Sequence, residues 1–229
     1  MPALLRATAK ARPPSVVADL GAGDGGTLWP LARAGLVAER IYAVDISAQR
    51  VAFCERLSPI VRGIVADAVD VAGLPDCSVD AVVSSQVIEH LPDDGPLAAE
   101  VARILRPGGW FYVSSVIRGR HAFWMRRGKS PAPRRWQLDA THMREYASED
   151  AFRAVLEHDA LQLDVVQSSQ LKFPVSDFVL RAAALARFIE PDKLSTYYLR
   201  STTLERIRTA VGVPIPGYRW VEATGRKVT

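Results

Sequence analysis

The residues of this sequence best suited to chemistry are an acid and three glycines at alternate positions. They are Asp19, Gly21, Gly23 and Gly25. They follow a short apolar run, and residues 27–36 can then form a helix. Glycine lets the backbone turn sharply and lie close to a ligand, and the start of a helix presents unpaired N–H groups. The pattern therefore predicts a strand, a turn and a helix that hold a nucleotide-like cofactor with an anionic group.

A second acid narrows the kind of cofactor without deciding it. Asp45 ends the next apolar run, over residues 41–45, where a carboxylate can accept both hydroxyls of a ribose. The loop fits an S-adenosylmethionine (SAM) site, but Gly21, Gly23 and Gly26 also satisfy the spacing of a dinucleotide-binding loop. At this point SAM and NAD(P) both remain open.

Three later segments separate the two cofactors. Asp67 and Ala68 close a third apolar run, residues 78–92 contain a fourth, and residues 105–110 contain a Pro-Gly-Gly turn. In this order and spacing the chain resembles class I SAM-dependent methyltransferases, in particular the small-molecule, ubiquinone-biosynthesis-like subgroup ("methyltransferase 11/12" type). The resemblance is close over residues 14–116 and looser through residues 141–146.

The resemblance implies how the loop would bind the cofactor. The loop with Gly21, Gly23 and Gly25 would surround the methionine portion of SAM, and Asp19 would lie near its ammonium group. Asp45 would bind the two ribose hydroxyls. These assignments agree with the chemistry of the groups, because a carboxylate of SAM needs N–H donors and its ammonium needs an acid.

The resemblance also implies the adenine site and the region beyond the sulfonium. Ile46 would pack on the face of the adenine, Asp67 would accept from the adenine amine, and the backbone N–H of Ala68 would donate to the ring. Ser85 and Gln86 would line the site past the sulfonium. A dinucleotide enzyme would have no assigned task for Asp67, so the resemblance favours SAM as the cofactor.

Histidines are the candidates for catalytic chemistry. Methyl transfer from a sulfonium uses an activated donor, so a general base is needed only for an acceptor that keeps its proton, such as a hydroxyl. His90 and His142 lie in segments that the family places around the acceptor, and His142 is our first choice for the base. The alternative is that His142 and Arg144 bind substrate or hold the loop in place.

Cys54 and Cys77 lack metal-ligand spacing, and we expect no metal dependence.

Residues 117–136 are rich in arginine and contain no acid. Arg126, Arg127 and Trp136 are our candidates for substrate binding, because arginine forks suit a carboxylate or phosphate and an aromatic ring can stack on a flat acceptor. Two interpretations stay open: a site for an anionic acceptor and a solvated lid. RNA is the less favoured acceptor, since the sequence shows no RNA-binding domain.

The elements that must position these residues alternate along the chain, which predicts a parallel sheet with helices on both faces. Expected strands cover residues 16–20, 41–45, 61–66, 79–84, 110–116, 160–166 and 218–223. Expected helices cover residues 27–36, 47–57, 96–105 and 148–159, with Ser47 and Ser148 as N-caps. The predicted fold is an α/β, Rossmann-like, seven-stranded, mostly parallel sheet flanked by helices, with a helical lid insertion.

We expect a single domain over residues 1–229. It comprises a SAM-binding core over 14–116, a basic lid loop over 117–147 and a helical insertion over 169–215, which is a pocket roof, a dimer face or both. The net charge of +4 and the isoelectric point of about 9.3 permit an anionic acceptor without demanding nucleic acid. No apolar run approaches the ~20 residues of a membrane span, and two unpaired cysteines fit the cytoplasm.

The function expected from the sequence is SAM-dependent transfer of a methyl group to a small-molecule acceptor. Three alternatives stay open: a non-catalytic SAM-binding or regulatory subunit, an RNA methyltransferase, and an NAD(P)-dependent oxidoreductase. A homodimer is also compatible with the apolar helices of the insertion.

Overall fold

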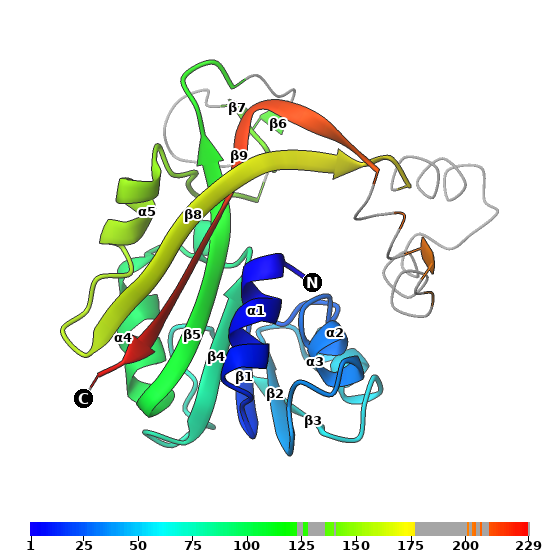
Figure 1. Cartoon of the computed structure of the whole chain (residues 1–229), viewed down its shortest axis with the longest axis vertical. Coiled ribbons are helices and arrows are strands. Elements are labelled where there is room, and N and C mark those ends of the chain that lie inside the picture. Colours follow the sequence, from blue (N-terminus) through cyan, green and yellow to red (C-terminus); the bar gives the residue numbers. More distant parts are fainter. Residues whose placement is uncertain are drawn as a thin grey trace.

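The computed structural model describes residues 1–122, 126–127, 136–139, 141–176, 201, 203–204, 207 and 211–228, with backbone alone at 126–127 and 136–137. A central sheet runs through the molecule with helices on its two faces (Figure 1). The helices are α1 (Ala3–Ala11), α2 (Leu28–Arg33), α3 (Ala48–Glu55), η1 (Ile88–His90), α4 (Gly95–Ile104) and α5 (Glu149–Ala154). The strands are β1 (Val16–Leu20), β2 (Arg40–Asp45), β3 (Val61–Val65), β4 (Val79–Ser85), β5 (Leu105–Arg118), β6 (Arg126–Arg127), β7 (Trp136–Gln137), β8 (Leu161–Pro174) and β9 (Gly212–Lys227).

The main sheet has seven strands in the order β3-β2-β1-β4-β5-β9-β8. Neighbours among β1 to β5 pair in parallel, whereas β9 pairs antiparallel with both β5 and β8. The predicted seven-stranded, mostly parallel, Rossmann-like sheet is therefore confirmed. The chain proceeds from β1 outward to β2 and β3, and from β4 outward in the opposite direction to β5. The carboxyl ends of β1 and β4 therefore border the place where ligands bind in open α/β sheets.

Apolar side chains cover both faces of the sheet, since neighbouring residues of a strand point to opposite sides. One buried cluster contains Ala18 and Val82 together with residues of α4 and α5 such as Leu97 and Phe152. The other contains side chains from α1, α2 and α3, which lie on the near side of the sheet in Figure 1. Buried parallel strands with both faces covered explain the near-continuous apolar runs in the sequence.

Helix boundaries are set by local chemistry. The Ser47 hydroxyl accepts from the Arg50 N–H at the start of α3, and the Ser148 hydroxyl accepts from the Ala151 N–H at the start of α5. Both predicted N-caps are confirmed. The helix expected over 27–36 is shorter, because Gly35 adopts a φ of 63° and ends the helical path.

Three strands of the main sheet are much longer than the sequence-based expectation. β5 begins at Leu105 rather than residue 110, since Leu105 already pairs with Val79 and the residues before Trp110 form an irregularity in the strand. β8 and β9 are longer than expected, so the helical insertion predicted over 169–215 is wrong at both ends: residues 169–174 belong to β8 and residues 212–215 to β9. Residues 175–176, 203–204 and 207 are helical, and the rest of the insertion lies outside the described residues.

The physical reason for the missed lengths is that these strand ends lie beyond the core of the sheet. Residues 167–170 are all polar, and β9 contains Pro214 and Pro216 near its start, which together favour a loop in the sequence. Residues 212–214 pair with β8, residues 215–217 lie at an irregularity in that pairing, and none of the six pairs with β5; a free strand edge or an irregularity tolerates proline. The segment expected as a lid loop contains β6 and β7, which pair antiparallel.

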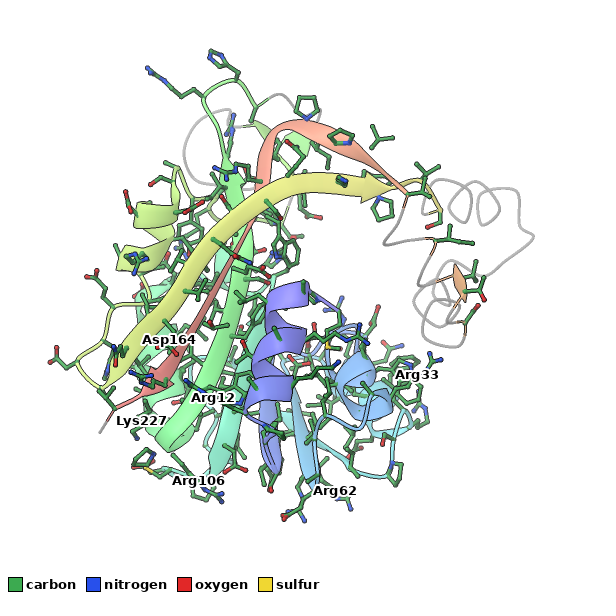
Figure 2. All side chains as sticks on the ribbon, in the orientation of Figure 1. Arg12, Arg33, Arg62, Arg106, Asp164 and Lys227 are labelled. Carbon is green, nitrogen blue, oxygen red and sulfur yellow. The ribbon has the colours of Figure 1, made fainter. Side chains whose placement is uncertain are left out.

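The end of the sheet where β1 and β4 begin is tied together by charged side chains. Asp80 accepts from Arg106 at 2.7 Å and from the Val16 N–H at 2.8 Å. Arg12 lies 3.6 Å from Asp164 across to β8, and Figure 2 shows these two side chains close together. These contacts fix the starts of the strands and leave the opposite edge of the sheet for the glycine loop.

Candidate functional site

The glycine loop after β1 is held against the end of β2. The N–H groups of Gly21 and Ala22 both donate to the Val44 carbonyl at 2.8 Å. Gly21, Gly23 and Gly25 all have positive φ angles, between 53° and 75°, which L side chains rarely adopt. The loop therefore has a fixed shape, and glycine is the residue that adopts its backbone angles most easily.

The three glycines serve different purposes. A Cβ atom on Gly21 would lie 2.3 Å from the side chain of Val87, and one on Gly25 would lie 2.4 Å from Leu57. A Cβ atom on Gly23 would meet nothing closer than the Gly21 carbonyl oxygen at 4.0 Å. Gly21 and Gly25 are thus required for packing, whereas Gly23 borders open space where a ligand can approach the backbone.

Asp19 is a buried acid without a full set of partners. Its exposed fraction is 1%, and its Oδ2 atom has no hydrogen-bond donor. Burial raises the pKa of Asp19 to about 7, with a further increase from the nearby Asp45 charge and an opposing effect of the Leu28 N–H. An unpaired buried carboxylate oxygen beside the loop fits the ammonium group of a SAM molecule, which would supply the missing cation.

Asp45 connects the loop to the helix that follows β2. Its Oδ2 atom accepts from the Gly23 N–H and its Oδ1 atom from the Ser47 N–H, both at 2.9 Å. Each carboxylate oxygen can accept more than one hydrogen bond, so both keep capacity for the hydroxyls of a ribose. The carboxylate thus orients the loop and remains suited to its expected role.

Two apolar side chains lie exposed where the adenine is expected. Ile46 is 76% exposed and Val65 is 56% exposed, at the ends of β2 and β3. Asp67 is exposed and accepts from the Val69 N–H at 3.1 Å, while Ala68 is buried. Val65 was not among the predicted site residues, although the alternation of side chains along β3 could have indicated it. Exposed apolar side chains beside an acid fit a flat, apolar ring with an amine.

Ser85 ends β4 and Gln86 follows it, just before Val87, whose side chain lies against Gly21 of the loop. The Ser85 hydroxyl lies 2.9 Å from the Ser114 hydroxyl, and the Gln86 N–H donates to the Ser114 carbonyl at 3.0 Å. Gln86 has a φ of 59°, and its side-chain Nε2 is buried without a partner. A strained residue with an unpaired donor is a common property of functional sites.

The structure brings His90 and His142 together although 51 residues separate them. Their ring centroids lie 4.9 Å apart in an edge-to-face arrangement. His142 is 4% exposed, and its Nδ1 lies 3.0 Å from Glu145 Oε1. The His90 residue is exposed overall, but its ring is partly removed from water. This loss of hydration, and then the neighbouring His142, lower the pKa of His90. Glu145 was not predicted as a site residue, although its position three residues after His142 could have indicated it.

Glu89 completes this cluster. It is fully buried, its Oε2 accepts from the Ser115 hydroxyl at 2.9 Å, and its Oε1 has no partner. Burial raises the pKa of Glu89 to about 7. The ligand-type atoms of Glu89, His90 and His142 all lie within 4.8 Å of one another.

Arg144 makes contacts with the loop after β4. Its guanidinium donates to the carbonyls of Leu91 at 2.8 Å and Pro92 at 2.7 Å, and it lies 3.4 Å from Asp94. This geometry favours the interpretation that Arg144 holds the loop in place. For the other predicted substrate residues, Arg126, Arg127 and Trp136, the backbones pair in β6 and β7 and the side chains lie outside the described part of the structure.

Comparison with known proteins identifies the family to which the stretch containing the glycine loop is similar. The family described as "Methyltransferase domain" matches residues 18–113. A "Probable S-adenosylmethionine-dependent methyltransferase" of Mycolicibacterium smegmatis is 39% identical over 105 residues, which are 44% of this chain and 38% of that protein. A ubiquinone biosynthesis O-methyltransferase of Burkholderia lata is 28% identical over 109 residues, 45% of this chain and 46% of that protein.

A solved structure of a geranyl diphosphate methyltransferase in complex with SAM has a TM-score of 0.57, covering 97% of this chain and 85% of that chain at 17% identity. The fold is therefore that of the Rossmann-like methyltransferases. Residues 18–113 carry a methyltransferase domain of the SAM-dependent kind, so the resemblance seen in the sequence is confirmed. The matched stretch spans less than half the length of these two curated relatives. No helix in the described part of the chain is long and apolar enough to cross a membrane.

Proposed function

We propose that this chain catalyses transfer of a methyl group from SAM to a small-molecule acceptor. The observation that carries the proposal is the unpaired, buried Oδ2 of Asp19 beside a glycine loop that is open at Gly23. Bound SAM supplies the activated methyl group. Asp19 accepts from its ammonium, Asp45 accepts from its ribose hydroxyls, and Ile46 and Val65 cover its adenine.

Calorimetry with SAM tests the binding half of the proposal. We expect the wild type to bind SAM, and Asp19→Asn to weaken binding by about 1–3 kcal/mol, the scale of a lost hydrogen bond to a charged group. Asp159→Asn, an exposed acid after α5, is the matched control and should bind as the wild type does. Binding of NAD(P) instead of SAM would favour an oxidoreductase and contradict the proposal.

Turnover tests the catalytic half. Formation of S-adenosylhomocysteine with one member of a panel of small-molecule acceptors distinguishes an enzyme from a non-catalytic SAM-binding subunit, which binds SAM without forming product. Adding RNA to the panel tests the remaining alternative, an RNA methyltransferase. SAM binding with no product from any acceptor would favour the regulatory subunit.

For the acceptor, we propose an anionic small molecule that contacts the arginines of the β6–β7 segment. The support is a run of cations and aromatic residues without acids at the place where the chain leaves β5. Arg126→Gln combined with Arg127→Gln should raise the acceptor KM without changing the Kd of SAM, whereas Arg33→Gln on the exposed end of α2 should change neither. Unchanged kinetics in the double variant would favour a solvated lid.

The homodimer stays a prediction, because most of residues 169–215 lie outside the described residues.

The base for a hydroxyl acceptor stays a prediction at His142. Its Nδ1 faces Glu145, so its Nε2 is the atom with a free lone pair. Glu145 would stabilise the ring after it takes a proton, as a carboxylate does for a catalytic histidine. The same lone pair could instead bind a metal ion, a role that excludes proton acceptance and that the unpaired oxygen of Glu89 indicates.

A further inference from the structure

We propose that Glu89, His90 and His142 form a binding site for a divalent first-row transition-metal ion, which holds an oxygen of the acceptor. The role in catalysis rests on the proposed methyltransferase function, but the metal site itself stands on the geometry of these three side chains. It departs from the sequence analysis, in which no metal dependence was expected.

The first argument is that three electron-pair donors converge, with no hydrogen bond among them in the described part of the structure. The Thr141 hydroxyl donates to Asp139 at 2.7 Å, so at the 3.1 Å contact with His90 Nδ1 the ring nitrogen must be the donor. Each histidine engages its Nδ1 with a neighbouring oxygen, which leaves Nε2 as a bare lone pair on both rings.

The second argument is the state of Glu89. Its carboxylate is fully buried, and Oε1 has no partner while Oε2 is bound by Ser115. A buried carboxylate oxygen without a donor is costly, and a cation removes that cost. One metal cation could therefore accept an electron pair from each of the two Nε2 atoms and from Glu89 Oε1.

The third argument is the outer layer of contacts. Histidines that bind metals usually donate their other N–H to a carboxylate, a carbonyl or a water, which fixes the ring and raises its basicity. Glu145 provides this contact for His142, and the Glu145 side chain is itself 2% exposed. Thr141 and Asp139 provide it for His90. Both rings are thus oriented in the way that a metal ligand requires.

The spacing of the ligand atoms fits a single ion after a small adjustment. Bonds of about 2.1 Å place two ligands of one ion roughly 3–4 Å apart. One ligand-type atom from each of the three side chains lies within 4.8 Å of the other two, and His90 is exposed enough for its ring to rotate toward the buried pair. Two imidazoles favour Mn²⁺, Co²⁺ or Zn²⁺ over Mg²⁺ and Ca²⁺, which prefer oxygen ligands.

The position of the cluster connects it to the reaction. Val87, two residues before Glu89, lies against Gly21 of the cofactor loop. Three protein ligands leave coordination positions open, as in catalytic metal sites. An acceptor hydroxyl bound there would lose its proton to water more easily. Its oxygen would then form the new O–CH₃ bond as the S–CH₃ bond breaks, and the electron pair of that bond would stay on sulfur.

Direct titration of the full-length chain with Co²⁺, after removal of metals with EDTA and desalting, tests the site. We expect one equivalent to bind and to produce visible absorption bands. His90→Ala and the isosteric Glu89→Gln should each weaken Co²⁺ binding by about 10-fold or more, and circular dichroism should show that both variants are folded. His158→Ala removes an imidazole beyond α5, is the matched control and should bind as the wild type does.

Folded wild-type protein that shows no saturable binding of Co²⁺, Mn²⁺ or Zn²⁺ below about 1 mM would overturn the metal site, as would equal affinity in the two variants. Calorimetry with SAM in the presence of EDTA separates the two proposals. SAM binding without metal binding contradicts the metal site alone, whereas metal binding without SAM binding contradicts the proposed function and leaves the site intact.

Discussion

At the scale of single residues, the proposed binding of SAM depends on the glycine loop and on the acids beside it. Asp19 is buried with an unpaired oxygen, and Asp45 uses both carboxylate oxygens to hold the backbone of the loop and of α3. Gly23 is the glycine of this loop whose missing side chain leaves open space. The loop is therefore shaped before any ligand arrives, which lowers the entropic cost of binding.

Replacing Gly23 tests whether the open space belongs to the cofactor. Gly23→Val should weaken SAM binding by about 100-fold or more, which is roughly 2.7 kcal/mol, because the new side chain occupies the ligand's place. Gly35→Val is a matched control, since Gly35 also has a positive φ, of 63° against 53°, and also borders open space. Both variants should lose similar stability from backbone strain, but SAM binding in Gly35→Val should be unchanged in calorimetry.

The raised pKa of Asp19 predicts a specific dependence of stability on pH. The pKa is about 7 in the folded protein against 3.8 ordinarily, so folding favours the protonated acid. This contribution is complete below about pH 4 and is lost as the pH rises to about 7. Without SAM, the Tm of the wild type should therefore fall over this range relative to Asp19→Asn.

Saturating SAM should reduce this fall, because its ammonium favours the ionised carboxylate. Thermal unfolding of both proteins at several pH values, with and without SAM, gives the measurement. A constant Tm difference between wild type and Asp19→Asn across this range would show that Asp19 ionises normally.

At the scale of elements, the segments that follow β4 and precede α5 form one unit. The Met143 N–H donates to the Glu89 carbonyl at 2.8 Å, and Arg144 binds the carbonyls of Leu91 and Pro92. Tyr146 then pairs with Ile117 of β5. These contacts place His142 beside His90 and explain how a distant segment reaches the end of the sheet.

Arg144→Gln tests whether this unit depends on the arginine. It should lower the free energy of unfolding by about 1–3 kcal/mol, because the carbonyls of Leu91 and Pro92 lose charged donors. Such a loss lowers Tm by about 2–4 °C per kcal/mol in a chain of this size. The acceptor KM should change little, and Arg153→Gln on the exposed face of α5 is the control. An unchanged Tm with a raised acceptor KM would instead assign Arg144 to substrate binding.

The sequence predicted the core elements well, because buried parallel strands are continuous apolar runs that end in recognisable acids and glycines. It predicted β8 and β9 poorly, since Pro214 and Pro216 argue for a loop when the free edge of the strand is unknown. It could not reveal the contacts of Glu89, because the burial of Glu89 and its unpaired oxygen depend on tertiary structure. The pairing of Glu145 with His142 joins residues three positions apart, so the spacing could have suggested it.

At the scale of the whole molecule, the candidate cofactor site lies where the two hydrophobic clusters meet the ends of the parallel strands. Val44 and Ala68 belong to one cluster, whereas Ala22 and Cys54 belong to the other. The Cys54 thiol also contacts the Gly23 carbonyl at 3.3 Å, which links α3 to the loop. A ligand that spans Asp19, Asp45 and Asp67 would therefore bind elements packed on both faces of the sheet.

This arrangement predicts that SAM raises the stability of the entire domain rather than of one loop. A ligand at 100 times its Kd stabilises the folded state by about 2.7 kcal/mol. With about 2–4 °C per kcal/mol for a chain of this size, Tm should rise by roughly 5–10 °C in a single cooperative transition. S-adenosylhomocysteine should give a similar rise, NAD(P) should give none, and Gly23→Val should show no rise with SAM. Two separate transitions, or a rise with NAD(P) alone, would contradict a single SAM site that connects the two halves of the core.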